Sequence, residues 1–182
     1  MNFRRINVIG PSGSGKSTFS RQLAALLNVE YIEMDAIHWL PNWENLDDVA
    51  FCAALDHRLK GDAWVLDGNY SRTQPVKWKN VECVIWLNLS FARTTARIVW
   101  RSIKRAMDKK ELWAGTGNTE SFRQSFWSRD SVILWSVQSY QRHPQRFAEF
   151  TSDPALSHIQ FIRLRSPAAV RKFLSSVTST MT

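Results

Sequence analysis

The chain has 182 residues, 44% of them hydrophobic and 22% charged, which suits one soluble globular domain with a sizeable core. Its formal net charge of +8 fits two kinds of anionic partner, nucleic acid or the phosphates of small substrates. No apolar run is long enough to span a membrane, and a strand begins almost at the first residue, so we expect a cytoplasmic protein without a signal peptide. Cys52 and Cys83 fall in a predicted helix and a predicted strand, and we interpret them as small buried side chains.

Apolar runs and amphipathic stretches alternate along the chain and predict an α/β fold. Alternating strands and helices form a parallel sheet covered by helices on both faces. We therefore expect a single three-layer α/β/α domain over residues 1–182, with a five-stranded parallel sheet. The predicted strands are residues 4–9, 29–34, 63–66, 81–87 and 158–164, and the predicted helices are residues 16–27, 45–61, 90–108, 119–142 and a final helix from residue 166.

Several helix ends are marked by residues typical of caps. Asn28 is the predicted C-cap of the first helix, and Asn45 the predicted N-cap of the second. Pro144 is predicted to end the long helix that precedes it, because proline lacks a backbone N–H. Ser166 and Pro167 fit the N-cap and first position of the final helix.

The stretch from Gly10 to Ser17 fits the phosphate-binding pattern G-x-x-x-x-G-K-[ST] at every defined position, between a predicted strand and a predicted helix. Glycines let the backbone N–H groups approach an anion, and the helix N-terminus favours phosphate. Lys16 can place a charge on the β- and γ-phosphates of ATP, which makes it a candidate catalytic residue. The residues predicted to bind nucleotide are Gly10, Pro11, Ser12, Gly13, Ser14, Gly15, Lys16, Ser17, Thr18, Arg97 and Arg165.

Two oxygen-bearing side chains are predicted to hold Mg²⁺. The hydroxyl of Ser17 occupies the magnesium position of the loop pattern. Asp67 ends the apolar strand Trp64-Val65-Leu66, where phosphate-loop enzymes carry a carboxylate that holds the metal directly or through water. An aspartate after a strand is also a common turn former, so this role depends on the phosphate loop.

The helix over residues 90–108 carries a row of basic residues opposite Phe91, Ile98 and Met107. We interpret Arg97 and Arg101 as catalytic cations that close over the transferring phosphate; the alternative is a solvated basic face. The lid is predicted at about residues 101–125, with a mobile loop at Trp113–Asn118. Closure of the region Lys109–Asn118 would exclude water, and Arg123 or Arg129 could join it.

Candidate residues for the second substrate follow the second and third strands. Asp35, His38 and Arg72 are predicted to bind the phosphate acceptor, within or beside a segment of about residues 35–61. Asp35 can act as a general base or as a hydrogen-bonding partner, and Arg72 can pair with an anionic group. His38 can equally cap or pack.

The order of these motifs resembles nucleoside-monophosphate kinases of the adenylate kinase type. That resemblance implies a five-stranded parallel sheet, a mobile lid and a helical substrate-binding segment. It also implies that Asp67 lies near Mg²⁺ and that Arg97 and Arg101 contact adenine and phosphates.

A group within this superfamily, the bacterial DNA-topology-modulation or flagellar-regulator-like kinases, is similar over nearly the whole chain. True adenylate kinases have Asp-Gly-Phe-Pro-Arg after the third strand, whereas here Asp67 precedes Gly68-Asn69-Tyr70-Ser71-Arg72. This departure argues against AMP as the acceptor and leaves a small metabolite open, as in shikimate or gluconate kinases. The phrases shared with the group are Gly13–Thr18, Met34–Trp39, Trp64–Tyr70, Gly117–Glu120, Ser128–Ser131 and Leu134-Trp135.

The sequence therefore favours an ATP-binding small-molecule kinase that uses Mg²⁺ and whose acceptor is a nucleotide or a small metabolite; it does not decide between a monomer and a dimer. Two alternatives remain open at this point: an ATP-binding regulator that associates with DNA, and an ATPase whose acceptor is water. Basic residues gather on the predicted lid helix, and no helix-turn-helix or zinc finger is visible, so nucleic acid is not the favoured partner.

Overall fold

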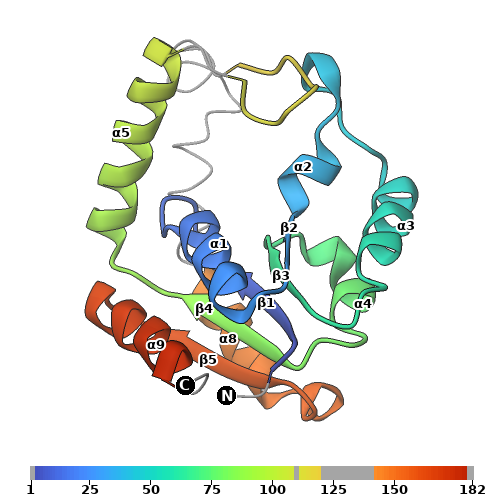
Figure 1. Ribbon diagram of the computed structural model, residues 1–182, viewed down its shortest axis with the longest axis vertical. Coiled ribbons are helices and arrows are strands. Elements are labelled where there is room, and N and C mark those ends of the chain that lie inside the picture. Colours follow the sequence, from blue (N-terminus) through green and yellow to red (C-terminus); the bar gives the residue numbers. More distant parts are fainter. Residues whose placement is uncertain (1–2, 109–110, 120–141, 180–182) are drawn as a thin grey trace.

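Five parallel strands in the order β2-β3-β1-β4-β5 form the centre of the computed structural model, which describes residues 3–108, 111–119 and 142–179 (Figure 1). Helices pack on both faces of the sheet, which confirms the predicted three-layer α/β/α fold. The strands are β1 (Arg5–Ile9), β2 (Glu30–Glu33), β3 (Trp64–Asp67), β4 (Cys83–Leu87) and β5 (Gln160–Leu164). The helices are α1 (Lys16–Leu27), α2 (Met34–His38), α3 (Asp48–Arg58), α4 (Gln74–Lys77), α5 (Phe91–Asp108), α8 (Arg142–Ser152) and α9 (Pro167–Ser179), with short 3₁₀ turns η1 (Pro41–Trp43), η2 (Ser71–Thr73) and η3 (Pro154–Leu156).

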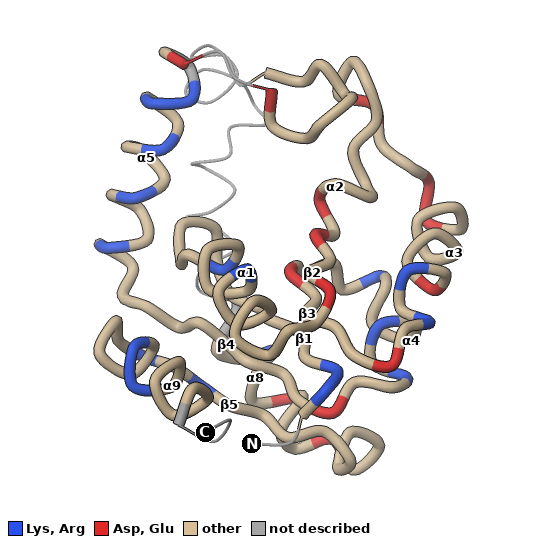
Figure 2. Tube along the Cα trace, in the orientation of Figure 1, with Lys and Arg blue, Asp and Glu red and all other residues tan. Residues whose placement is uncertain are grey.

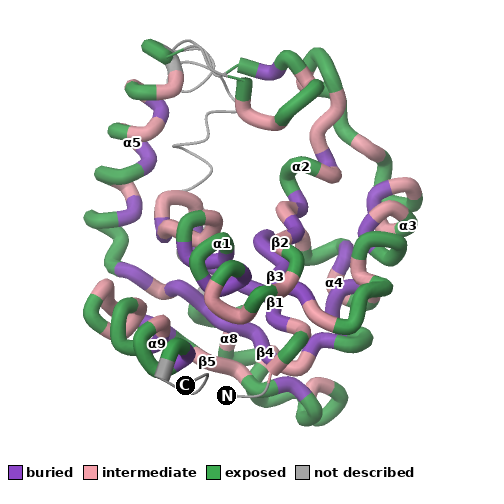
Figure 3. The backbone as a smooth tube through the Cα atoms, viewed as in Figure 1, coloured by how far each residue is buried: buried purple, intermediate pink, exposed green. Residues whose placement is uncertain are grey.

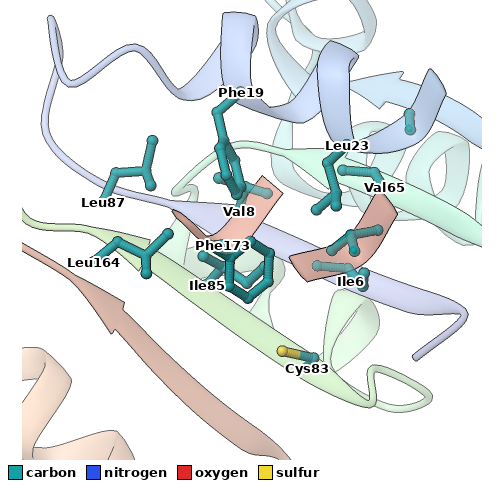
Figure 4. Close-up of a cluster of buried hydrophobic side chains, with 12 residues drawn as sticks. Ile6, Val8, Phe19, Leu23, Val65, Cys83, Ile85, Leu87, Leu164 and Phe173 are labelled. Atoms are coloured by element: carbon teal, nitrogen blue, oxygen red, sulfur yellow. The ribbon is translucent and has the colours of Figure 1, made fainter. Parts of the chain in front are cut away.

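Two hydrophobic clusters, one on each face of the sheet, form the core. On one face α1 and α9 meet through Phe19 and Phe173, whose ring centroids lie 5.9 Å apart (Figure 4). On the other face Phe51 and Leu55 of α3 pack with Trp78, which follows α4. Burial is concentrated in the central strands, and the outer helices are mostly exposed (Figure 3). Of the described helices, none is long and apolar enough to cross a membrane.

The central strands supply both clusters because successive side chains of a strand point to opposite faces. In β3, Val65 joins the cluster under α1 and α9, while Leu66 joins the opposite one. Asn7 of β1 is fully buried, and its amide nitrogen donates to the carbonyl oxygens of Leu66 at 3.1 Å and Gly68 at 3.3 Å. Its amide oxygen accepts a hydrogen bond from the indole of Trp78 at 2.9 Å. A polar side chain is therefore satisfied inside the core, and it fixes the turn that leaves β3.

The structure corrects two predicted helix boundaries. Pro144 does not end a helix; it is the third residue of α8, where proline is tolerated because the first N–H groups of a helix have no intrahelical partner. The N-cap of α3 is Asp47, and not Asn45: its carboxylate accepts a backbone N–H three residues on at 2.7 Å. Asn28 caps α1 as predicted, with a φ of 53°. The predicted helix over residues 119–142 lies almost entirely outside the described residues.

Lys77, at the end of α4, is a buried cation in the layer beneath the sheet. Lys77 is only 2% exposed, and its ammonium donates a hydrogen bond to the carbonyl oxygen of Tyr70 at 3.1 Å. Burial lowers the pKa of Lys77 from its ordinary value to about 7. In the unfolded chain, the side chain of Lys77 stays protonated to a much higher pH than in the folded chain. Raising the pH through and above 7 therefore stabilises the fold.

We expect Lys77→Met to remove this contribution to the pH dependence of stability. From about pH 7 to about pH 8.5, the wild-type free energy of unfolding should rise relative to that of Lys77→Met, with a slope approaching about 1.4 kcal/mol per pH unit. Denaturant unfolding at several pH values measures the two curves. Lys79→Met, at an exposed position on the same turn, should keep the wild-type slope. Parallel curves for wild type and Lys77→Met would contradict a buried, shifted lysine.

Candidate active site

The phosphate-binding loop connects β1 to α1 at the carboxyl edge of the sheet (Figure 1). Gly15, the N-cap residue of α1, has a φ of 88°, and Gly13 has a φ of 75°, in the left-handed region that favours glycine. The loop therefore leads directly into the first turn of α1, where backbone N–H groups lack intrahelical partners. This is a backbone arrangement suited to a phosphate group.

A residue to which the sequence analysis gave no role, Asn69, fixes the start of this loop. Its Oδ1 accepts the N–H of Gly10 at 2.9 Å, and its Nδ2 donates to the carbonyl oxygen of Gly10 at 2.6 Å. Beside it, the N–H of Gly68 donates to the carbonyl oxygen of Val8 at 3.2 Å. The turn after β3 thus holds the loop after β1. The one sequence signal for this role was the position of Asn69 two residues after Asp67, at the end of a buried strand.

Helix α5 packs directly on the loop. A Cβ placed on Gly13 would overlap the carbonyl oxygen of Thr94 and lie 2.7 Å from Cγ1 of Ile98. The sequence predicted that Phe91 and Met107 share the side of α5 that carries Ile98, but they are 42% and 77% exposed. The buried side of α5 is narrower than predicted because the helix rests on a glycine loop and not on a broad apolar layer.

This packing brings Arg97 and Arg101 to the loop. Nη2 of Arg101 donates a hydrogen bond to Oγ of Ser12 at 3.0 Å. A Cβ placed on Gly15 would lie 3.5 Å from Nη1 of Arg97, so that guanidinium sits beside the last glycine of the loop. The basic residues of α5 otherwise follow the length of the helix (Figure 2). Both guanidinium groups thus lie beside the loop, although Arg97 is exposed, and their catalytic role stays a prediction.

Replacing Arg101 by alanine is expected to lower turnover about 10²-fold or more and to change the affinity for Mg-ATP much less. The reason is that a cation aimed at the transferring group contributes most where charge develops in the transition state. Steady-state kinetics and an ATP titration separate the two effects. Arg93→Ala, at an exposed position about two turns before Arg101 on the same helix, is the matched control and should leave both values unchanged. Unchanged turnover in Arg101→Ala would remove Arg101 from the mechanism.

Lys16 lies between the loop and the acidic ends of β2 and β3. Its ammonium donates to the carbonyl oxygen of Pro11 at 3.4 Å. Burial lowers the pKa of Lys16, while the carboxylates of Asp67 and Asp35 act in the opposite direction. These carboxylates favour the charged form of Lys16, the form that a phosphate group requires.

Asp67, the last residue of β3, is 5% exposed. The hydroxyl of Tyr31 lies 3.2 Å from its Oδ2 and 3.1 Å from Oε2 of Glu33, so one proton is shared between two acceptors. Its buried Oδ1 makes no hydrogen bond within the described part of the chain. Burial raises the pKa of Asp67, and the charge of Lys16 and the nearby hydroxyl of Ser17 lower it. One oxygen of the Asp67 carboxylate is therefore available to a ligand, beside the hydroxyl of Ser17.

That pair of oxygens fits a magnesium ion. Mg²⁺ is usually held by one or two protein oxygens and completes its octahedron with phosphate and water. Among the described residues, no group of three or more His, Cys, Asp or Glu side chains could hold a metal by itself. A metal at Ser17 and Asp67 would therefore depend on the phosphates of a substrate, and the role of these two residues as ligands stays a prediction.

The predicted acceptor residues gather on the other side of Lys16. The strand predicted to run to Met34 ends at Glu33, so Asp35 belongs to α2 and does not directly follow a strand. Its Oδ1 accepts a hydrogen bond from the hydroxyl of Tyr70 at 2.7 Å. Burial, and then the charge of Asp35, raise the pKa of Tyr70, which keeps this hydroxyl a donor. Asp35 remains exposed, and a second ligand can reach it.

Arg72 and His38, the other two predicted acceptor residues, contact each other. Nη1 of Arg72 lies 3.0 Å from Oδ1 of Asp48, and its Nη2 lies 3.3 Å from both ring nitrogens of His38. His38 is 5% exposed and packs on the ring of Phe51 with centroids 4.8 Å apart. Burial, and then Arg72, lower the pKa of His38 and favour the neutral ring, which can accept a hydrogen bond from the guanidinium. His38 therefore packs and supports Arg72.

The structure does not place Arg165 beside the other candidate residues, and two further predicted arginines are not described. Arg165 is exposed one residue after β5, and its role in nucleotide binding stays a prediction. Arg123 and Arg129 lie outside the described residues, as does part of the predicted lid. The described part of the lid loop, residues 111–119, packs against the segment that follows α2.

Comparison with solved structures supports the fold. A shikimate kinase from Acinetobacter baumannii, solved in complex with shikimate, superposes with a TM-score of 0.61 at 16% identity, over 99% of this chain and 93% of that one. A gluconokinase from Sinorhizobium meliloti 1021 superposes with a TM-score of 0.51 at 18% identity, over 97% of this chain and 93% of that one. Both are phosphate-loop kinases of the nucleoside-monophosphate-kinase-like fold, so the chain has this fold.

Sequence similarity to curated proteins is strong over a short stretch. The chain is 56% identical to shikimate kinase of Actinobacillus pleuropneumoniae serotype 5b over 34 residues, which cover 19% of this chain and 20% of that protein. It is 59% identical to shikimate kinase of Mannheimia succiniciproducens over 32 residues, which cover 18% of each. The matched stretch thus spans about a fifth of the length of these relatives. No protein-family model matches the chain.

Proposed function

We propose that this protein is a kinase that transfers the γ-phosphate of Mg-ATP to a hydroxyl group of a small acceptor. The observation that carries the proposal is the position of Lys16 in the phosphate loop and of Asp35, which the Tyr70 hydroxyl holds at 2.7 Å, at one edge of the sheet. The charge of Asp35 acts on the Lys16 ammonium against the larger effect of burial, which lowers the pKa of the lysine. A hydroxyl group bound to Asp35 would lie beside a phosphoryl group bound to Lys16. Both residues lie at the carboxyl edge of the sheet, where open α/β sheets bind their ligands.

In the proposed reaction, the acceptor oxygen forms a bond to the γ-phosphorus of ATP. The bond from that phosphorus to the oxygen shared with the β-phosphate breaks, and ADP leaves. The proton of the acceptor hydroxyl passes to a carboxylate oxygen of Asp35, which the Tyr70 hydroxyl holds in place at 2.7 Å. Phosphoryl transfer depends mainly on positioning and on cations around the equatorial oxygens, which Lys16, Arg97 and Arg101 would supply.

Magnesium is part of this proposal. A bound Mg²⁺ would supply positive charge that offsets the charge of the ATP phosphates. Ser17 and Asp67 would hold it through a hydroxyl oxygen and the buried Oδ1 of the carboxylate. Tyr31 keeps the other carboxylate oxygen of Asp67 oriented through a hydrogen bond of 3.2 Å.

The nature of the acceptor follows from the same side chains. Asp35 offers a carboxylate to a hydroxyl group, and Arg72 offers a guanidinium at the rim of the site. A hydroxy acid suits both groups. The likeness to a shikimate kinase solved with shikimate, and to a gluconokinase, supports this class of acceptor. The departure from the adenylate kinase motif after Asp67 argues against AMP.

A coupled assay of ADP release tests the proposal directly. Mg-ATP is supplied with nucleoside monophosphates, nucleosides, shikimate, gluconate and related hydroxy acids in turn. One acceptor should raise the rate at least about a hundredfold, which corresponds to some 2.7 kcal/mol of barrier. Slow ADP release that no acceptor changes would contradict a kinase and indicate an ATPase whose acceptor is water.

One structural observation favours the alternative, an ATP-binding regulator that associates with DNA. Trp100 is 70% exposed on α5, and it lines a shallow depression of about 520 Å³ with Arg93 and Arg97. An exposed aromatic ring among cations is a common platform for single-stranded nucleic acid. On the motif phrases quoted above, we also propose that the chain belongs to the bacterial DNA-topology-modulation group of these kinases.

A salt titration separates this alternative from the kinase. Affinity for a labelled single-stranded oligonucleotide should fall steeply as the salt concentration rises, and Trp100→Ala should weaken it. The absence of binding at low salt would exclude the alternative and leave the kinase assay unaffected.

A further inference from the structure

Three tryptophans and one asparagine join the lid loop to the acceptor-binding segment. Trp113 of the loop stacks on Trp39, which follows α2, with centroids 5.9 Å apart and planes 17° apart. Trp43 of η1 meets both rings edge-on, at 5.7 Å from Trp39 and 6.0 Å from Trp113. We call Trp39, Trp43, Trp113 and Asn118 the clasp. Its two sides are more than 65 residues apart in sequence.

Asn118 is the polar centre of the clasp. It is 2% exposed, its Oδ1 accepts the N–H of Trp43 at 3.0 Å, and its Nδ2 donates to the carbonyl oxygen of Leu40 at 2.8 Å. The backbone between these two partners is unusual, because Asn42 and Trp43 both have a φ of 60°. Left-handed backbone at two consecutive non-glycine residues needs support from its surroundings. The side chain of Asn118 supplies that support from the lid loop.

Each side of the clasp is held together on its own. In the lid loop, the N–H of Leu112 donates to the carbonyl oxygen of Asn118 at 2.9 Å, and Oε1 of Glu111 accepts the N–H of Gly117 at 2.6 Å. On the acceptor side, the N–H of Leu40 donates to the carbonyl oxygen of Glu44 at 2.8 Å. A displacement of one side is therefore passed to the other through the clasp and is not absorbed within a loose loop.

The acceptor side of the clasp leads directly to the candidate active site. The ring of Trp39 lies against the ring of His38 with centroids 5.1 Å apart, and the carbonyl oxygen of His38 accepts the N–H of Leu46 at 3.0 Å. His38 in turn contacts Arg72. The other side leads to the nucleotide: the lid loop lies beyond the C-terminal end of α5, the helix whose Arg101 bonds to Ser12 (Figure 1).

We propose that the clasp couples nucleotide binding at the phosphate loop to the position of the acceptor-binding segment, and that Asn118 is the positioning residue of this coupling. The inference rests on the proposed function, because it requires a nucleotide to engage Arg97 and Arg101. A phosphate group that draws these arginines inward displaces α5 and its following loop. The clasp then carries this displacement to Trp39 and His38, so an acceptor meets a different site when ATP is bound.

The experiment uses fluorine NMR of the full chain labelled with 5-fluorotryptophan, with Trp39→Phe and Trp113→Phe to assign two resonances. The probe is Mg²⁺ with the β,γ-imido analogue of ATP, whose binding is measured in parallel by calorimetry. In wild type, both resonances should shift along one binding curve. In Asn118→Ala, the Trp113 shift should remain, and the Trp39 shift should fall at least about fivefold, the lower end of allosteric coupling.

Controls make each outcome decisive. Asn80→Ala, at an exposed position, should behave as wild type. Trp113→Leu, which removes the stacking partner and leaves Asn118, should also reduce the Trp39 shift and serves if Asn118→Ala does not fold. A full Trp39 shift in either folded variant, with nucleotide still bound, overturns the coupling. Wild-type protein that binds the nucleotide without any Trp39 shift also overturns it. Calorimetry that shows no nucleotide binding overturns the proposed function itself.

Discussion

Replacing Lys16 by alanine is expected to lower phosphoryl transfer about 10³-fold or more, because one cation on the transferring group is lost from a site that depends on cations. The substitution also removes the ammonium on which the charges of Asp67 and Asp35 act. Binding of Mg-ATP should therefore weaken as well. The measurement is single-turnover transfer to the acceptor found in the panel, with nucleotide binding followed by calorimetry.

The matched control for this variant is Lys60→Ala, at an exposed position after α3. It removes the same charge from the chain and should leave the rate unchanged. Circular dichroism and thermal unfolding show whether the Lys16 variant keeps its fold. A folded Lys16→Ala protein with wild-type turnover would place the chemistry elsewhere than at the phosphate loop.

Asp67→Asn is expected to raise the Mg²⁺ concentration needed for half-maximal rate at least about tenfold and to lower the maximal rate about 10²-fold. The amide keeps the shape of the carboxyl group but lacks the charge that favours a metal and the oxygen that lies buried without a partner. Initial rates as a function of Mg²⁺, at fixed ATP, measure both effects.

Glu33→Gln is the control for Asp67→Asn because Glu33 accepts from the same Tyr31 hydroxyl at 3.1 Å. Glu33 already pairs with Arg21 at 2.7 Å. Its loss should change the Mg²⁺ requirement less than about fivefold, the scale of an exposed ion pair. Equal effects of the two substitutions would show that general negative charge, and not a metal ligand, is what the site requires.

The parts of the account that the sequence could predict are local in the chain. The loop from Gly10 to Ser17 has a pattern that specifies its own backbone, and the apolar strands on either side specify a parallel sheet. Once the sheet is known, Asp67 and the segment that starts at Asp35 must lie at its carboxyl edge, because parallel strands end together. The fold and the meeting of Lys16 with both carboxylates follow from these few steps.

What the sequence could not predict depends on contacts between distant segments. In the sequence, Asn69 and Tyr70 have the pattern of ordinary turn residues. Their contacts with Gly10 and Asp35 follow only from the order of the strands in the sheet. The buried side of α5 was predicted too wide because hydrophobicity does not reveal that the helix packs on a glycine of the loop, Gly13. Asn118, in a polar stretch typical of an exposed loop, is buried because it satisfies the backbone of Leu40 and Trp43.

The most direct test of the central claim is ³¹P NMR of the wild-type protein with Mg-ATP and the acceptor that stimulates ADP release. If the protein is a small-molecule kinase, a phosphomonoester resonance should grow in step with ADP, with little inorganic phosphate, and should be absent in Lys16→Ala. Growth of inorganic phosphate alone, at the same rate with and without the acceptor, would contradict the account and show that the phosphate loop serves hydrolysis.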